Sequence, residues 1–180
     1  MRFTDLMVVA EGTHASIYQA KGSSDDVGTP YCVKIFGLDW MTPFNLEVKA
    51  YEILLEDEYM KEYIPKIYSW GKRTVLNWNQ DIYYGLVLEW VENAEWLFTQ
   101  NIAVRHAVSL VAGLSRMHEL GVSHNDKFAQ NLLVVRQPER ALWIDFSCAY
   151  FDERETHPQH TEGLVGEIVD KVPQISSWLC

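Results

Sequence analysis

One polar stretch constrains this chain most, because it stands directly before an apolar hairpin that ends in a second acidic turn. The stretch is His124–Asn131, with the sequence HNDKFAQN, and the triplet DFS at Asp145–Ser147 begins nineteen residues after Asp126. Between them lie two apolar runs, Leu132–Val135 and Ala141–Ile144, separated by a short polar segment. This pattern predicts a strand, a turn and a second strand.

Such a hairpin would return Asp145 to the loop that holds Asp126 and Asn131. Two carboxylates and an amide oxygen in a small space suit a hard cation such as Mg²⁺, which binds through carboxylates together with substrate phosphates. The same residues also suit an ordinary polar turn before a hairpin. The rest of the chain has to show whether the partners of such a site are present.

Length and charge limit the classes of function. The 180 residues suffice for one sizeable domain or two small lobes, and 48% hydrophobic residues with seven Trp indicate a packed core. The formal net charge of −10 argues against binding to nucleic acid or to an anionic membrane surface. A nucleotide is not excluded, because Mg²⁺ can bridge carboxylates to phosphates.

The cysteines and the apolar runs bear on the compartment. Cys32, Cys148 and Cys180 are odd in number and widely spaced, which fits neither a disulfide framework nor a metal-binding pair and favours a reducing environment. The sequence shows no signal-peptide pattern and no uncharged run of membrane-spanning length. We therefore expect a soluble protein of the cytoplasm.

The first ninety residues alternate between apolar runs and turn-forming segments. Five of these runs predict strands, the first two forming a hairpin: Leu6–Ala10, Ala15–Ala20, Tyr31–Phe36, Ile67–Gly71 and Tyr83–Val91. Between the third and fourth strands, Pro43 to about Tyr59 predicts a helix. Thr42 is the expected N-cap of the helix, with Pro43 at the first helical position. Residues 22–30 and 77–81 have the composition of loops.

Two charged residues stand out within these elements. Lys34 interrupts the apolar run Tyr31–Phe36, and a buried ammonium is costly unless it meets an anion. The alternative is an edge strand from which Lys34 reaches the solvent. Glu47 lies beside the apolar stripe of the predicted helix, near Phe44 and Val48, and is the helix acid best placed to point inward. An exposed Glu47 is the alternative.

The second half has a different composition. Apolar residues at helical spacing over Asn101–Leu120 predict a long helix that ends at Gly121. Residues 90–100 are expected to cross between two lobes, with or without a short helix. Residues 151–160 suggest a loop, and residues 161–179 suggest a helix that Pro173 interrupts.

Four motifs, in this order, resemble those of the protein kinases. Ala10–Ile17 resembles the glycine-rich loop G-x-G-x-x-G-x-V, with Ala in two of its three Gly places. Cys32–Lys34 resembles the end of V-A-I-K, and His124–Asn131 and Asp145–Ser147 resemble H-R-D-x-x-x-x-N and D-F-G. The resemblance covers about residues 3–150.

The resemblance implies an α+β, protein-kinase-like bilobal fold in a single domain, residues 1–180. Residues 1–88 would form an N-lobe with a five-stranded antiparallel sheet and one helix. Residues 89–93 would form the hinge, and residues 94–180 a reduced, mainly helical C-lobe.

The resemblance also implies roles for particular residues, with ATP and Mg²⁺ as cofactors. Asp126 would orient the acceptor hydroxyl and take its proton, Lys34 would hold the nucleotide phosphates, and Glu47 would hold Lys34. Asn131 and Asp145 would bind the metal.

Further residues would hold the nucleotide, with Leu88 as the gatekeeper and the backbone of Glu89 and Val91 on the adenine. The full set of expected cofactor-binding residues is Ala10, Gly12, Ile17, Cys32, Lys34, Leu88, Glu89, Val91 and Leu133. Alanine in place of glycine reduces the adaptability of the loop, and Ser147 in place of glycine stiffens the turn after Asp145. His124 is expected to be structural, packing under the catalytic loop.

The chain departs from protein kinases after Asp145. Only thirty-five residues follow it, without an A-P-E triplet, so the part that normally positions a peptide substrate is missing. The favoured hypothesis is a phosphotransferase that moves the γ-phosphate of Mg-ATP to a hydroxyl of a protein (Ser/Thr) or of a small molecule. The alternative is a pseudokinase, a nucleotide-binding or fold-only regulatory module. A protein partner that covers the reduced C-lobe is a further possibility.

Overall fold

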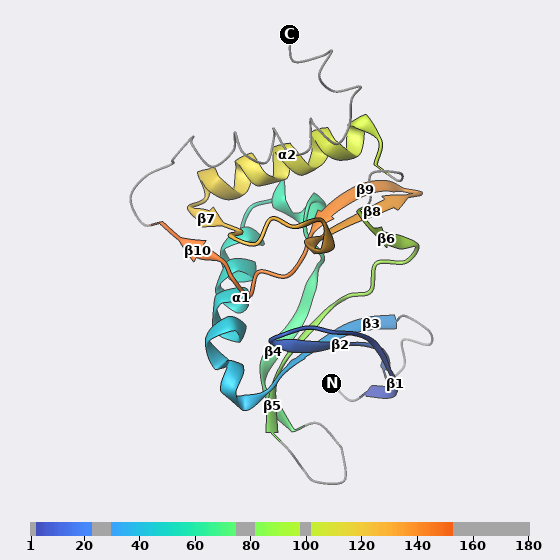
Figure 1. Cartoon of the computed structure of the whole chain (residues 1–180), viewed down its shortest axis with the longest axis vertical. Helices are drawn as coiled ribbons and strands as arrows, with labels where there is room; N and C mark the ends of the chain where they lie inside the picture. The colour runs from blue at the N-terminus through green and yellow to red at the C-terminus, as the bar shows by residue number, and fades with distance from the viewer. Residues whose placement is uncertain (1–2, 23–29, 75–81, 98–101, 153–180) are drawn as a thin grey trace.

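A five-stranded antiparallel sheet forms the first half of the chain, in the order β1-β2-β3-β5-β4. The computed structural model describes residues 3–22, 30–74, 82–97 and 102–152 (Figure 1). The strands are β1 (Phe3–Glu11), β2 (Ala15–Gly22), β3 (Pro30–Phe36), β4 (Ile67–Thr74) and β5 (Ile82–Glu89). Helix α1 (Met41–Leu54) follows the third strand. The prediction of an α+β fold with this sheet and one inserted helix is confirmed. Of the loop expected at 22–30, Gly22 ends β2 and Pro30 begins β3; residues 23–29 and the loop expected at 77–81 lie outside the described residues.

Strand β3 is central in the sheet, and this position decides the environment of Lys34. Lys34 pairs with Ile17 of β2 on one side and with Leu86 of β5 on the other. Its side chain cannot reach the solvent from an edge, and only 4% of the residue is exposed. The alternative of an edge-strand lysine is therefore wrong.

Helix α1 begins earlier and ends earlier than its sequence predicts. Trp40, not Thr42, is the N-cap residue, and a short 3-10 helix at Leu38–Trp40 leads into α1. The helix ends at Leu54, before the predicted end at Tyr59. A carboxylate oxygen of Asp57 accepts a hydrogen bond of 3.0 Å from the backbone N–H of Met60. This bond favours a turn, since Asp side chains compete with the helix for backbone groups, and a second 3-10 helix follows at Met60–Glu62.

The described part of the second half contains one α-helix and two small sheets. Its elements are β6 (Ala94–Trp96), α2 (Val104–Glu119), β7 (Val122–Ser123), a 3-10 helix at Ala129–Asn131, β8 (Leu132–Arg136), β9 (Glu139–Trp143) and β10 (Tyr150–Phe151). The sheets have the orders β6-β8-β9 and β10-β7. The described residues of the second half thus combine one long helix with several short strands, and β6 stands within the segment where a short helix was suggested. The expected loop at 151–160 and helix at 161–179 lie almost entirely outside the described residues.

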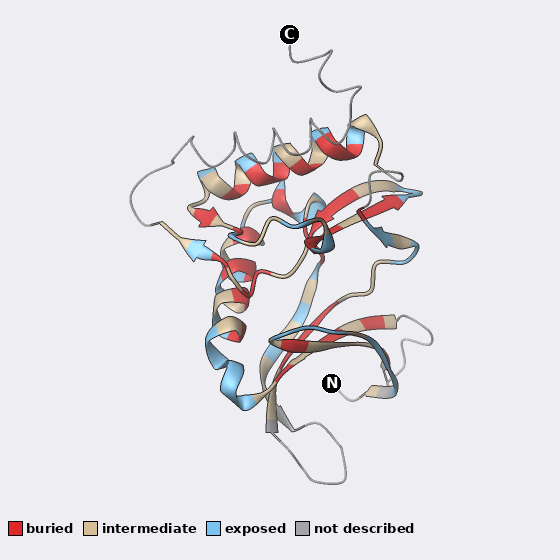
Figure 2. Ribbon diagram, viewed as in Figure 1, coloured by how far each residue is buried: buried red, intermediate tan, exposed pale blue. Residues whose placement is uncertain are grey.

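Helix α2 has clear boundary signals. At its start, Nδ1 of His106 accepts a hydrogen bond of 3.1 Å from the backbone N–H of Ala103. At its end, Gly121 has a φ of +73°, the left-handed conformation that glycine adopts beyond a helix C-terminus. The buried face of α2, red in Figure 2, packs on strand β9 of the hairpin. The predicted helix and its glycine stop are confirmed, with a start at Val104 and not at Asn101.

One hydrophobic cluster extends through both halves. Trp143 on β9 is fully buried, and its indole N–H donates to the backbone oxygen of Leu110 on α2 at 3.0 Å. The backbone N–H of Trp143 donates to the backbone oxygen of Tyr63, in the first half of the chain, at 2.8 Å. Arg116 of α2 also forms an ion pair of 2.6 Å with Asp57. These contacts fix the hairpin against the segment that follows α1.

Neither α1 nor α2, in the part of the chain that the structure describes, is long and apolar enough to span a membrane.

Replacing Gly121 by Ala should destabilise the fold. An added Cβ would lie 2.8 Å from the backbone oxygen of Asp152, and alanine disfavours a φ of +73°. We expect a loss of about 2 kcal/mol in the free energy of unfolding, measured by urea denaturation. Gly37→Ala is the matched control, because Gly37 has a φ of −63° and its added Cβ would meet only Trp40 at 3.5 Å. Equal effects of the two substitutions would contradict this explanation.

Candidate functional site

A cavity of about 590 Å³ lies between the five-stranded sheet and the second half of the chain. Every residue that the sequence predicted for catalysis, nucleotide binding or metal binding lines it. They are Ala10, Gly12, Ile17, Cys32, Lys34, Glu47, Leu88, Glu89, Val91, Asp126, Asn131, Leu133 and Asp145. The fold thus brings together side chains from β1 to β9 that are far apart in the sequence.

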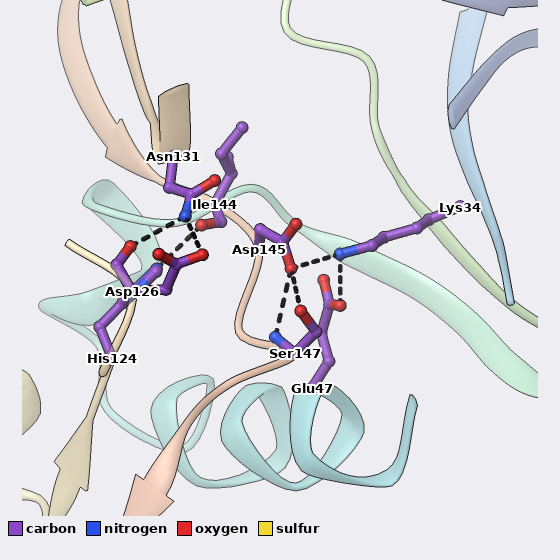
Figure 3. Close-up of polar contacts among 8 residues, drawn as sticks. All are labelled: Lys34, Glu47, His124, Asp126, Asn131, Ile144, Asp145 and Ser147. Carbon is purple, nitrogen blue, oxygen red and sulfur yellow. Dashed lines mark hydrogen bonds and ion pairs between the residues drawn. The ribbon is translucent and has the colours of Figure 1, made fainter. Parts of the chain in front are cut away.

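Lys34 is at the centre of the polar contacts in this cavity (Figure 3). Its Nζ lies 2.6 Å from Oε2 of Glu47 on α1 and 2.7 Å from Oδ1 of Asp145, which follows β9. Burial alone would lower the pKa of Lys34, but the charges of Glu47 and Asp145 outweigh it, and the pKa is raised. Lys34 is therefore a fixed cation that joins the helix to the acidic turn.

The two acids beside Lys34 are in different electrostatic environments. Glu47 is fully buried, and burial raises the pKa of its carboxyl to about 7 against the opposing charge of Lys34. Burial also disfavours the charge of Asp145, but the Lys34 charge and hydrogen bonds from Lys34 and Ser147 lower its pKa to about 2. Asp145 is therefore ionised at neutral pH, whereas the carboxyl of Glu47 keeps its proton to a higher pH than an ordinary glutamate does.

The loop acid and the loop amide contact each other directly. Nδ2 of Asn131 donates to Oδ2 and to the backbone oxygen of Asp126, both at 2.8 Å. Because the amide nitrogen makes these bonds, the amide oxygen of Asn131 is left to accept other partners. The backbone N–H of Ile144 donates to the backbone oxygen of Asn131 at 3.0 Å, which places Asp145 beside this loop.

No group of three or more His, Cys, Asp or Glu in the described part of the chain could hold a metal ion by itself. An oxygen pair from Asn131 and Asp145 suits Mg²⁺, which usually binds through one or two carboxylates and completes its shell with water and substrate phosphates. A metal at these residues would therefore need a phosphate ligand to be held well.

A row of aromatic rings in edge-to-face and tilted contacts packs beside the acidic turn. The ring of Phe146 lies 5.3 Å from the ring of Tyr51 on α1 and 4.9 Å from that of His124, which lies 5.2 Å from Trp143. His124 is fully buried, and its Nε2 donates to the backbone oxygen of Ile144 at 2.9 Å. Burial lowers the pKa of His124, so the ring is held neutral. The expectation that His124 is structural is confirmed.

The chain crosses between its halves at Glu89, and its carboxylate is bonded on both sides. Oε1 lies 3.0 Å from a guanidinium nitrogen of Arg140 on β9, and Oε2 accepts a hydrogen bond of 3.1 Å from the backbone N–H of Lys66. The backbone N–H of Glu89 donates to the oxygen of Lys66 at 2.7 Å. Glu89 thus ties the end of β5 to the hairpin β8–β9.

The turn between β1 and β2 closes the other side of the cavity. The backbone N–H of Gly12 donates to the oxygen of Ala15 at 2.9 Å. The ring of His14 packs on that of Trp40, with 4.7 Å between the centroids. The turn is therefore braced against the start of α1.

Sequence reasoning missed several residues of the site. Trp96 lines the cavity because β6 pairs it with Leu133, and no pattern in residues 94–96 predicted that strand. The bond of Arg140 to Glu89 joins residues 51 positions apart, and no local signal marks it. Ser147 was noted only as a departure from glycine, although its hydroxyl donates to Oδ1 of Asp145 at 2.6 Å.

The charges around the cavity are unbalanced. Lys34 is the one Lys or Arg among the described lining residues, and two carboxylates already surround it. The carboxylates of the lining belong to Glu11, Glu47, Glu89, Asp126 and Asp145. A polyphosphate could bind here only with cations that offset this negative charge.

Comparison with known proteins assigns the chain to no family, since no family model matches it and no curated protein is similar to it in sequence. The residues of the cavity and their geometry therefore have to carry the functional interpretation.

The raised pKa of Glu47 predicts a pH dependence of stability. Between the ordinary value of 4.5 and about 7, the folded state holds a proton that the unfolded state has released. Stability from this group is therefore lost as the pH rises through that window. We expect the free energy of unfolding of the wild type, relative to Glu47→Gln, to decrease by about 1 kcal/mol or more from pH 5 to pH 7 in urea denaturation. A difference that stays constant or increases would contradict the raised pKa.

Proposed function

We propose that this chain has a compact, protein-kinase-like bilobal fold and is an ATP-dependent phosphotransferase. The reaction would move the γ-phosphate of Mg-ATP to a hydroxyl of a protein or small-molecule substrate. The observation that carries the proposal is the ion-paired triad in which Lys34 contacts both Glu47 and Asp145, in the cavity that Asp126 and Asn131 also line. Protein kinases need the same lysine–glutamate pair and the same aspartate in place.

The arrangement of elements supports the lobe boundaries. The five-stranded sheet and α1 lie within residues 3–89, so β5 ends at the first residue of the proposed hinge, and the described elements from β6 onward lie within residues 94–180. Residues 89–93 would form the hinge, and the side chain of Glu89 is held by Arg140 and by the backbone of Lys66.

The nucleotide base would lie on the apolar side of the cavity. Ile17, Cys32, Leu88 and Leu133 supply side chains there, and apolar walls with a few polar groups are typical of ligand pockets. The backbone of Glu89 and Val91 would bind the adenine, although the N–H of Glu89 already donates to Lys66. For Glu89 the proposal therefore relies on its carbonyl oxygen.

The phosphates would lie between the β1–β2 turn and the acidic residues. Ala10 and Gly12 present a small-residue surface of that turn to the cavity, and Lys34 supplies the positive charge. Asn131 and Asp145 would hold Mg²⁺, which neutralises phosphate charge when bound. Because the cavity lining carries an excess of carboxylates, nucleotide binding should depend strongly on this cation.

Asp126 would act on the acceptor. Its carboxylate lines the cavity and is held by Asn131 at 2.8 Å, so it is oriented before a substrate arrives. A positioned carboxylate can orient an acceptor hydroxyl and take its proton, and phosphoryl transfer depends chiefly on positioning and electrostatic stabilisation. The pseudokinase alternative would share the nucleotide site but would not transfer phosphate.

Ligand binding is tested by thermal unfolding of the whole chain with ATP, with Mg²⁺, and with both. We expect little change with ATP alone and a rise in Tm of about 5–10 °C with both at a hundredfold excess over Kd. Asp145→Asn should abolish the rise, while Lys61→Met, at an exposed ion pair with Glu58, should leave it intact. No rise in any combination would exclude the proposed nucleotide site.

Phosphoryl transfer is tested by incubation with [γ-³²P]ATP, scored as labelled protein or slow release of phosphate. Asp126→Asn should bind Mg-ATP like the wild type but transfer about 10²–10⁴-fold more slowly, since it loses the proton acceptor. Binding by the wild type without transfer or hydrolysis would favour the pseudokinase alternative. Equal turnover by Asp126→Asn would exclude the assigned role of Asp126.

A further inference from the structure

We propose that Ser147 is a positioning residue that sets the orientation of the Asp145 carboxylate toward the bound cation. The inference rests on the proposed function, because it assumes that Asp145 is a metal ligand. It adds a residue with no counterpart in the D-F-G triplet that the sequence resembles, where glycine occupies this place.

The contacts of Asp145 are distributed unevenly between its two oxygens. Oδ1 accepts from Nζ of Lys34 at 2.7 Å, from the hydroxyl of Ser147 at 2.6 Å and from the backbone N–H of Ser147 at 3.3 Å. All three contacts that the structure gives to this carboxylate fall on the same oxygen (Figure 3). The second oxygen, Oδ2, is thereby left for a ligand from the cavity.

The hydroxyl is well placed to hold this orientation. Ser147 is buried, with 5% of the residue exposed, so water competes little for the bond to Oδ1. The backbone N–H alone forms a longer bond to Oδ1, which any residue at position 147 could form. The short bond from Oγ is specific to a hydroxyl side chain, and bonds to ionised groups are stronger than neutral ones.

The backbone conformation of Asp145 also depends on contacts that hold this turn. Asp145 has a φ of +62°, a strained conformation for a residue other than glycine, which persists only where the surroundings enforce it. The ring of Phe146 fixes the next residue between Tyr51 and His124. The two hydrogen bonds from Ser147 hold the side chain of Asp145 in the same turn. The carboxylate is therefore oriented before the cation binds.

Partners that orient a metal ligand typically change metal affinity about 10–100-fold when they are removed. Without the Ser147 hydroxyl, Oδ1 would be held only by Lys34 and by the backbone N–H. The carboxylate would then rotate more freely about χ2, and part of the metal-binding energy would be needed to orient it. A merely structural serine would instead alter stability and leave the cation affinity unchanged.

The test measures the affinity of the whole chain for Mn²⁺ in the presence of ADP, by electron paramagnetic resonance of the free ion. The variants are Ser147→Ala, Ser147→Gly and Ser147→Thr, with Asp145→Asn as the reference for a lost ligand. We expect Kd for Mn²⁺ to rise about tenfold in Ser147→Ala and in Ser147→Gly. Ser147→Thr, which keeps a hydroxyl, should stay close to the wild type.

The outcomes separate this proposal from the proposed function. If Asp145→Asn weakens Mn²⁺ binding and Ser147→Ala does not, the positioning role is overturned and the metal site stands. If Asp145→Asn binds Mn²⁺ like the wild type, the metal site and the role of Ser147 both fail. Thermal unfolding identifies any variant that does not fold. If Ser147→Ala does not fold, Ser147→Gly supplies the comparison.

Discussion

A buried ammonium is the constraint on which the rest of this structure depends. Lys34 lies on the central strand of the sheet, where it is 4% exposed, and its charge is tolerable only because two carboxylates meet it. One of these comes from α1 and the other from the turn after β9. The sheet, the helix and the hairpin therefore have to be assembled together, and the cavity that they enclose is a consequence of that assembly.

The same charge arrangement shapes the chemistry of the cavity. Lys34 is already neutralised, and further carboxylates surround the remaining space. A phosphate group entering this space meets oriented oxygens of Asn131 and Asp145 and a negative field. Under the proposed function, a nucleotide would therefore bind together with a divalent cation, because neither the anion nor the cation alone would be held well. Ser147 and the aromatic rings around Phe146 hold the acidic turn in place.

Much of this organisation could be predicted from the sequence because it depends on local patterns. The strands, the helix with Glu47 facing inward and the glycine at the end of α2 follow from periodicity and glycine chemistry. The start of α1 at Met41, the strand β6 and the bond of Arg140 to Glu89 could not be predicted. Each depends on a tertiary partner that no single stretch of sequence identifies. The sequence alone did not decide whether Lys34 is buried or reaches the solvent from an edge strand. The central position of β3 in the sheet decides it.

A crystal structure of the chain with a non-hydrolysable ATP analogue and Mg²⁺ would be the most informative measurement. The proposed function predicts phosphate oxygens at Lys34 and a cation bound by the side-chain oxygen of Asn131 and by Oδ2 of Asp145. The adenine should lie between Ile17 and Leu133. A nucleotide bound elsewhere, or a cation that contacts neither Asn131 nor Asp145, would contradict it.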